Sequence, residues 1–308
     1  MGKHILKYIR LFRLKATLIY LFPFALALSV GIEQTSRGIA RGEPYSWYTI
    51  LFAYLAYFCG SIFSSSLNFY ADVPADRIHD GLYKDQDISK QPFATGEMSS
   101  LETNLLFALT AIGCVVFSFL VNIRFAAFML GAVFLLGILY SHKWFRLKEK
   151  PVLDIVTNAT GAVLILFAGM AIVSRDNPPA IPIIFGWIFS ATMYMPSVAN
   201  DVPFDEAAGF MTSGVYFGQK RLIHAMVPLA VILLCFGIWG AFQTSLNWQY
   251  RLFLGLGGPA ASFATALIML LYHPPHIELN PDILLFPLAC LLFFYIVLGI
   301  YRVVTKKW

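Results

Sequence analysis

Long apolar runs, separated by polar stretches, dominate the pattern of hydrophobic and polar positions along this chain. A helix that crosses a bilayer needs about 20 predominantly apolar residues. About nine runs approach that length: 16–33, 47–70, 101–121, 124–141, 153–173, 180–199, 222–243, 250–271 and 282–303. The pattern therefore predicts an all-α integral membrane protein, with about nine transmembrane helices packed in a bundle.

Composition agrees with a chain embedded in a lipid bilayer. Of its 308 residues, 58% are hydrophobic and 13% are charged, whereas a soluble domain carries roughly 25% charged residues. Each of the four cysteines lies in a different apolar run and none forms a close pair, so neither a disulfide framework nor a zinc site is predicted. The net charge of +5 is modest and spread over the loops, which argues against a nucleic-acid partner.

The longer polar connections predict the orientation of the bundle. With nine spans, the N-terminus and the stretches 72–100, 142–152 and 200–221 lie on the same face, which carries 14 of the 22 Lys and Arg residues. Loops rich in Lys and Arg stay on the cytoplasmic side of a membrane. We therefore expect a cytoplasmic N-terminus and cytoplasmic polar loops.

Two copies of one acidic motif stand out in this apolar background. Asp72-Val73-Pro74-Ala75-Asp76 and Asp201-Val202-Pro203-Phe204-Asp205 each follow an apolar run, on the same predicted face. Carboxylates at the edge of a membrane segment are costly to desolvate and usually mark a binding site. Each aspartate alone could be a helix cap or a solvated interfacial residue, but the repeated skeleton favours a functional site.

The spacing of the two motifs also bears on domain organisation. They lie 129 residues apart, each after an even-numbered span. This favours a pseudo-repeat of residues 1–150 and 151–275, with an extra helix at 282–303. No change in composition separates the halves, so we treat residues 1–308 as a single domain.

The first motif has a spacing that suits metal and phosphate chemistry. Asn68, Asp72 and Asp76 recur every four residues, which places them on one face of a helix. Pro74 removes an amide donor, so we expect the helix to end or kink there. Magnesium prefers such oxygen ligands and is usually held by one or two carboxylates, water and substrate phosphate oxygens. Two facing motifs with basic residues nearby therefore predict a clamp for a diphosphate.

These residues resemble the two aspartate-rich motifs of the UbiA superfamily of intramembrane prenyltransferases. Asn68-x-x-x-Asp72-x-x-x-Asp76 is similar to the first motif and Asp201-x-x-x-Asp205 to the second. Supporting matches are Arg13, Tyr140-Ser141, Arg146-Leu147-Lys148, Pro151-x-x-Asp154-x-x-x-Asn158, Gly209 and Gly218-Gln219-Lys220-Arg221. The chain departs from the family pattern at Gln91, where many members have arginine, and at His142-Lys143, where many have prolines.

The resemblance implies a bundle around a central cavity that cytoplasmic loops cap. It implies that Mg2+ bridges the acidic motifs to an isoprenyl diphosphate, whose ionised prenyl group is transferred to a lipophilic acceptor, aromatic or isoprenoid. The implied catalytic residues are Asp72, Asp76, Asp201 and Asp205, and Asn68 joins them as a metal ligand. The implied diphosphate-binding residues are Arg13, Lys90, Tyr140, Ser141, Lys143, Arg146, Lys148 and Lys220.

Two other functions remain open on the sequence alone. A terpene cyclase of the same family would use the same aspartates and act on the isoprenyl diphosphate without an acceptor. An ion-coupled transporter would also have internal repeats, broken helices and acidic residues within the membrane. The position of the carboxylates at the rim, beneath long polar loops, favours an enzyme.

Overall fold

A computed structural model describes residues 7–8, 10–12, 14–82, 92–243 and 251–271. The described residues are almost entirely helical, and their one β feature is an isolated bridge between Gly42 and Ser174. The all-α fold predicted from the apolar runs is therefore confirmed.

The helices follow the apolar runs closely. The longer ones are α2 (Leu14–Ser36), α3 (Trp47–Leu82), α4 (Ser100–Val121), α5 (Ile123–Val133), α6 (Leu153–Ala171), α7 (Ala180–Asn200), α10 (Gln219–Gln243) and α12 (Gly258–Leu271). Two short π-helices adjoin these. η1 (Phe134–Leu139) follows α5 directly, and η3 (Phe253–Gly257) comes directly before α12. The shortest elements are the 3-10 turn η2 (Leu147–Glu149), α8 (Val202–Ala207) and α9 (Ser213–Phe217).

Six described helices are long and apolar enough to cross a membrane. They begin with the first part of α3 and include α4, α6, α7, α10 and the η3–α12 segment. The predicted spans 16–33 and 124–141 correspond to α2 and to the shorter apolar helix Ile123–Leu139. The span predicted at 282–303 lies outside the described residues, so the count of nine remains a prediction.

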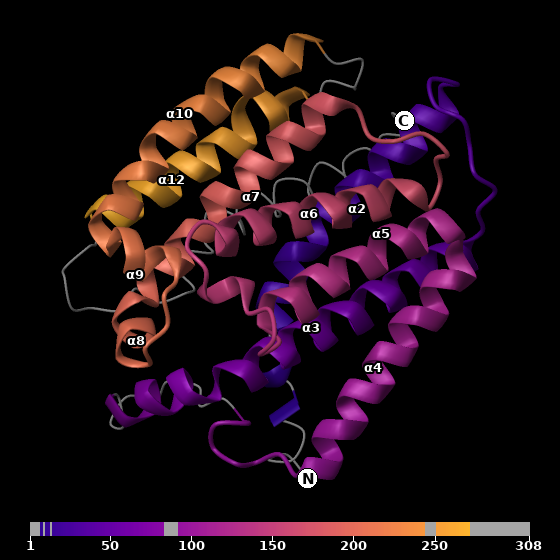
Figure 1. Cartoon of the computed structure of the whole chain (residues 1–308). Helices are drawn as coiled ribbons and strands as arrows, with labels where there is room; N and C mark the ends of the chain where they lie inside the picture. The colour runs from indigo at the N-terminus through magenta and orange to yellow at the C-terminus, as the bar shows by residue number, and fades with distance from the viewer. Residues whose placement is uncertain (1–6, 9, 13, 83–91, 244–250, 272–308) are drawn as a thin grey trace.

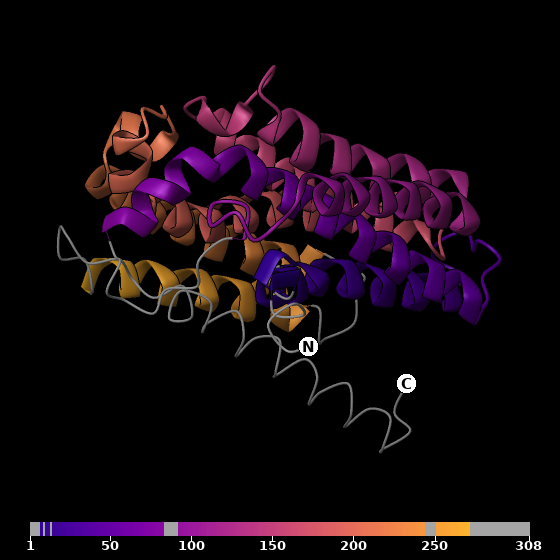
Figure 2. The ribbon, with the colours of Figure 1, turned by 90° about the horizontal axis from the view of Figure 1, so that it is seen from below.

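The long helices run side by side, and the short helices α8 and α9 lie together at one end of them (Figure 1). In Figure 1, α8 and α9 lie at the lower left, near the C-terminal part of α3, and Figure 2 shows the same grouping from below. The packing pairs include α3 with α4, α2 with α6, α5 with α6, α6 with α7, and α10 with α7 and α12. Contacts between α3 and α8 bring the two halves of the chain together at this end.

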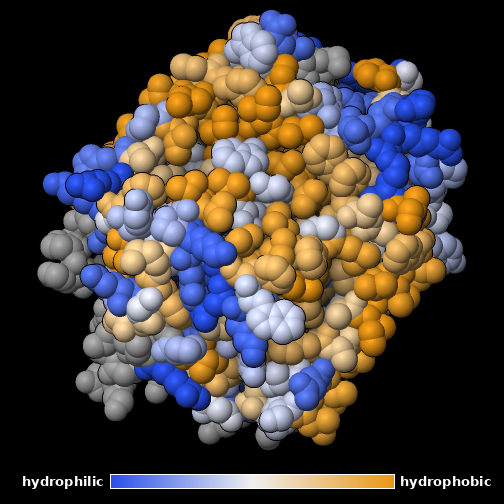
Figure 3. All heavy atoms as spheres, in the orientation of Figure 1, coloured by the Kyte–Doolittle hydropathy of each residue, from blue (hydrophilic) through white to orange (hydrophobic). Residues whose placement is uncertain are grey.

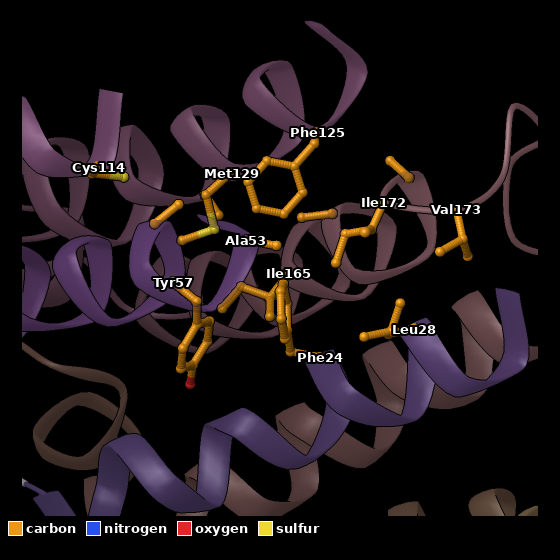
Figure 4. Close-up of a cluster of buried hydrophobic side chains, with 14 residues drawn as sticks. Phe24, Leu28, Ala53, Tyr57, Cys114, Phe125, Met129, Ile165, Ile172 and Val173 are labelled. Atoms are coloured by element: carbon orange, nitrogen blue, oxygen red, sulfur yellow. The ribbon is translucent and has the colours of Figure 1, made fainter. Parts of the chain in front are cut away.

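A buried cluster joins α2, α3, α4, α5 and α6 (Figure 4). The rings of Phe24 and Tyr57 lie 5.1 Å apart, and Phe125 meets Phe24 edge-on. Gly169 lets α6 approach α2, because a Cβ at this position would lie 2.4 Å from the Phe24 carbonyl oxygen. Close backbone contact of this kind stabilises helix pairs in a bilayer. Apolar side chains there gain little from packing against each other instead of against lipid tails, because both surroundings are apolar.

The surface has two polar regions separated by apolar residues. Figure 3 shows hydrophobic residues across the middle of one face, with hydrophilic residues towards the lower left and the upper right. The end opposite α8 and α9 includes the connections between α2 and α3 and between α6 and α7, which the bridge between Gly42 and Ser174 joins. Arg41 donates to both oxygens of Asp176 there, and Arg175 pairs with Glu43 at 2.5 Å. An apolar belt between two polar ends is the arrangement expected of a multi-pass membrane protein.

Candidate functional site

The first acidic motif lies on the C-terminal part of α3. Asn68, Asp72 and Asp76 all fall within this helix, as their four-residue spacing predicts. Of the two expectations at Pro74, an end of the helix is excluded, because α3 continues through the proline to Leu82, and a kink stays a prediction. A proline inside a helix removes one hydrogen bond to the preceding turn, and here the rest of the helix is retained.

The second acidic motif lies where one helix ends and another begins. α7 ends at Asn200, Asp201 occupies the junction, and α8 begins at Val202 with Pro203 in its first turn. Proline is well tolerated there because the first amides of a helix have no intrahelical acceptor. The same Asp-Val-Pro skeleton therefore interrupts the helical path in the second motif and not in the first.

The fold brings the two motifs together. Burial raises the pKa of the Asp205 carboxyl to about 7, and the negative charges of Asp201 and Asp72 add to this shift. Lys148 and a hydrogen bond from Thr212 act in the opposite direction. Carboxylates of α3, α8 and the junction before α8 thus share one electrostatic environment.

Lys148 connects the loop after η1 to the first motif. Its buried ammonium forms an ion pair with Asp72 and donates to the Asn68 side-chain oxygen at 3.2 Å. Ser141 donates to the same oxygen, also at 3.2 Å. Two of the predicted diphosphate-binding residues therefore lie directly against the first motif.

Tyr140 lies beside Tyr194, which no sequence motif marks as a candidate. Its hydroxyl forms a hydrogen bond with that of Tyr194, on α7. Tyr140 follows the π-helix η1, an element that often occurs at functional sites because it shifts the following side chains. The two tyrosines link the loop end of η1 to the helix that leads into the second motif.

The remaining predicted basic residues do not join this cluster in the described structure. Lys143 and Lys220 are exposed, and within the described residues neither forms an ion pair. Arg146 pairs with Glu149, and its guanidinium lies 5.0 Å from the centre of the Phe210 ring. Arg13 and Lys90 lie outside the described residues.

Several polar residues near the site escaped the sequence analysis as candidates. Thr212 donates to Asp205 at 3.0 Å, and Ser213 donates to Asp154 through both its backbone and its hydroxyl group. The sequence marks Asp154 only as part of the family pattern that begins at Pro151. A Thr-Ser pair shortly after an acidic motif is common in loops, so the sequence offers little signal of these contacts.

The oxygen ligands of the two acidic motifs suit a hard divalent cation only if a substrate supplies further ligands. Among the described residues, no group of three or more His, Cys, Asp or Glu side chains lies close enough to hold a metal alone. Asp72, Asp76, Asp201 and Asp205 nevertheless offer only oxygen ligands, and the pKa of Asp205 is raised first by burial and then by the negative charges of Asp201 and Asp72. Magnesium fits such a site, because it commonly keeps water and phosphate oxygens as ligands.

Comparisons with known proteins agree over most of the chain. A family model described as the UbiA prenyltransferase family matches residues 37–277. Two structures of a UbiA homologue from Archaeoglobus fulgidus, bound to Mg2+ with DMAPP or with GPP, superpose with TM-scores of 0.79 and 0.78. Their sequences are 27% and 26% identical to this chain, and each match covers 96% of this chain and 98% of the homologue.

Two curated relatives match a shorter region. A lycopene elongase/hydratase from Haloferax volcanii is 36% identical over 92 residues, and one from Halobacterium salinarum is 34% identical over 110 residues. These matches cover 30% and 36% of this chain and the same shares of the two relatives. The similarity therefore spans about a third of the length of each curated relative.

Proposed function

Because the chain belongs to the UbiA prenyltransferase family, we propose that it transfers an isoprenyl group from an isoprenyl diphosphate to a lipophilic acceptor, with Mg2+ as cofactor. The observation that carries this proposal is the meeting of the two acidic motifs, Asp72 with Asp76 and Asp201 with Asp205, beside the buried Lys148. The homologue structures that contain Mg2+ and an allylic diphosphate support it.

The acidic residues would hold the cofactor. Asn68, Asp72 and Asp76 would bind from α3, and Asp201 and Asp205 from the opposite side. Bound there, Mg2+ would supply Lewis acidity that stabilises the negative charge of the departing diphosphate.

Basic and hydroxyl groups would grip the diphosphate itself. Lys148 and Ser141 lie against Asn68, beside the acidic motifs that would hold Mg2+ and the diphosphate. Arg146 and the exposed Lys143 and Lys220 border the same end of the molecule, and Arg13 and Lys90 complete the proposed set. Charge-assisted hydrogen bonds of this kind are stronger than neutral ones.

The reaction would proceed by cleavage of the bond between the allylic carbon and the diphosphate oxygen. The diphosphate leaves with the bonding electron pair, and the π electrons of the acceptor form the new carbon–carbon bond to the allylic cation. A proton is then lost from the acceptor. The aromatic faces of Tyr140 and Tyr194, next to the diphosphate residues, would favour the cation electrostatically.

The partial similarity to two lycopene elongase/hydratases favours an isoprenoid acceptor over an aromatic one. The bilayer would supply such an acceptor from the apolar side of the bundle, and the polar loops would face the cytoplasm. Family membership argues against the transporter that the sequence alone left open.

Product analysis tests the proposal. Purified protein would be incubated with Mg2+ and allylic diphosphates of ten to twenty carbons, with and without a C40 polyene or an aromatic acceptor. Prenylated polyene that forms only with the acceptor present is the expected result. Hydrocarbons or terpene alcohols formed without an acceptor would identify a cyclase, and prenylation of the aromatic compound alone would overturn the acceptor class.

A further inference from the structure

Two polar connections of the chain meet at a buried carboxylate. Asp154, in the first turn of α6, is 1% exposed. One of its oxygens accepts from the Ser213 backbone amide at 2.8 Å, and the other accepts from the Ser213 hydroxyl at 2.5 Å and from the Ile155 amide at 2.8 Å. A carboxylate this deeply buried is stable only when its hydrogen bonds are satisfied, so the position of Ser213 is tightly defined.

The same serine also holds the end of the loop that carries Lys148. The Ser213 hydroxyl oxygen accepts from the Val152 amide at 2.7 Å. Val152 has a φ of 71°, a conformation rare for a β-branched residue and maintained only when its surroundings impose it. Ser213 therefore fixes a strained backbone turn four residues after Lys148.

The neighbouring residue reaches the second acidic motif. The Thr212 hydroxyl donates to Asp205 at 3.0 Å, while its oxygen caps the amide of Val215 in α9. Thr212 and Ser213 are adjacent in the chain, so a displacement of one moves the other. Together they join the Lys148 loop to Asp205.

We propose that Asp154 and Ser213 are positioning residues that set the place of Lys148 relative to the second acidic motif. Neither side chain touches the acidic cluster, and both act through the backbone of the Lys148 loop and through Thr212. The catalytic part of this inference rests on the proposed function. Groups that orient directly binding residues typically change activity 10–100-fold when they are removed.

Two substitutions disrupt the contact in different ways. Ser213→Ala keeps the backbone bond to Asp154 and removes the hydroxyl that serves both Asp154 and Val152. Asp154→Asn keeps the size of the side chain and replaces one acceptor by a donor. The matched control is Ser118→Ala, which removes a buried hydroxyl from α4, away from the site.

The first readout is kinetic. With an allylic diphosphate that the wild type turns over, each variant should lower kcat about 10–100-fold and raise KM for the diphosphate. The activity of the double variant should be no lower than that of the less active single variant, because both changes break the same connection. A merely structural role would reduce the active fraction, which lowers kcat alone and leaves KM unchanged.

The second readout does not depend on catalysis. Spin labels on unnatural amino acids would replace the exposed Trp144 and Glu206, and their separation would be measured by pulsed electron paramagnetic resonance. A narrow distance distribution in the wild type and in Ser118→Ala, broadened by Ser213→Ala or Asp154→Asn, supports the inference. An unchanged distribution, or unchanged kcat and KM, in whichever variant folds would overturn it. A wild type with no activity on any donor would refute the proposed function. The distance measurement would still show whether Asp154 and Ser213 hold the Lys148 loop in place relative to the second acidic motif.

Discussion

At the scale of single residues, the site is defined by how its negative charges are balanced. Lys148 pairs with Asp72, whereas Asp205 is partly buried and surrounded by the charges of Asp201 and Asp72. Within the described residues, the main charges that act on Asp205 are two carboxylates, Asp201 and Asp72, and one ammonium, that of Lys148. This imbalance favours the binding of a divalent cation together with its anionic substrate.

We expect Lys148→Met to lower the rate of diphosphate release about 100-fold, because one preorganised cation at the leaving group is lost. Steady-state release of diphosphate, with Mg2+ at saturation, measures this effect. Lys150→Met is the matched control, since Lys150 is an exposed ammonium on the same loop. Equal losses in the two variants would contradict the assigned role of Lys148.

The pKa of Asp205 predicts a dependence of magnesium binding on pH. A carboxyl with a pKa of about 7 is mostly protonated below that pH and must lose its proton to bind a metal. The Mg2+ concentration for half-maximal diphosphate release should therefore fall about fivefold between pH 6 and pH 7 and change less above pH 7.

Asp205→Asn separates this effect from the titration of the substrate. The amide cannot titrate, so the variant should need more Mg2+ than the wild type above pH 7, approach it in acid, and retain only the pH dependence of the diphosphate itself. If wild type and variant show the same pH dependence, Asp205 does not control magnesium binding.

At the scale of helices, the two acidic motifs show that one sequence skeleton can adopt two backbone paths. Pro74 lies well inside α3, whereas Pro203 lies in the first turn of α8. A proline in a helix interior removes a hydrogen bond, while one in the first turn removes none. The surrounding segments, rather than the motif, decide where the helix breaks.

This difference predicts opposite responses to alanine. Pro74→Ala restores a helical hydrogen bond and should raise the melting temperature in detergent, since proline costs a helix interior about 3 kcal/mol relative to alanine. Pro203→Ala should leave the melting temperature nearly unchanged. A larger gain from Pro203→Ala than from Pro74→Ala would show that the helical assignment of α3 around Pro74 is wrong.

The sequence could predict the local features of the fold and of the site, but not the contacts between distant residues. Apolar runs and the four-residue spacing of Asn68, Asp72 and Asp76 identified the helices and one face of the site, because both signals are local. The contacts of Tyr140 with Tyr194 and of Asp154 with Ser213 join residues 54 and 59 positions apart. Such pairs depend on helix packing, which a local pattern does not contain.

At the scale of the whole molecule, polar contacts also join the connections at the end of the bundle opposite α8 and α9. Arg41 donates to both oxygens of Asp176 and holds the pKa of that carboxyl below its usual range. These contacts join the connection between α2 and α3 to the connection between α6 and α7. Exposed ion pairs of this kind contribute little to stability.

Arg41→Ala should therefore lower the melting temperature slightly and leave kcat and KM unchanged. The Asp176 contribution is present above the ordinary carboxyl pKa and is lost as the pH falls through its lowered folded-state value. The stability difference between wild type and Arg41→Ala should thus shrink in acid. An effect of Arg41→Ala on the KM for diphosphate would contradict this separation of the two ends.

The central claim, that the two acidic motifs act together on a diphosphate, is tested most directly by Mg2+-dependent diphosphate release. Purified wild type would be compared with Asp72→Asn, Asp201→Asn and the double variant, using allylic diphosphates of ten to twenty carbons and membrane lipids as a source of acceptor. We predict release that requires Mg2+, is nearly abolished by either substitution and is reduced little further by combining them. Release that persists in both single variants, or that does not require Mg2+, would contradict the account.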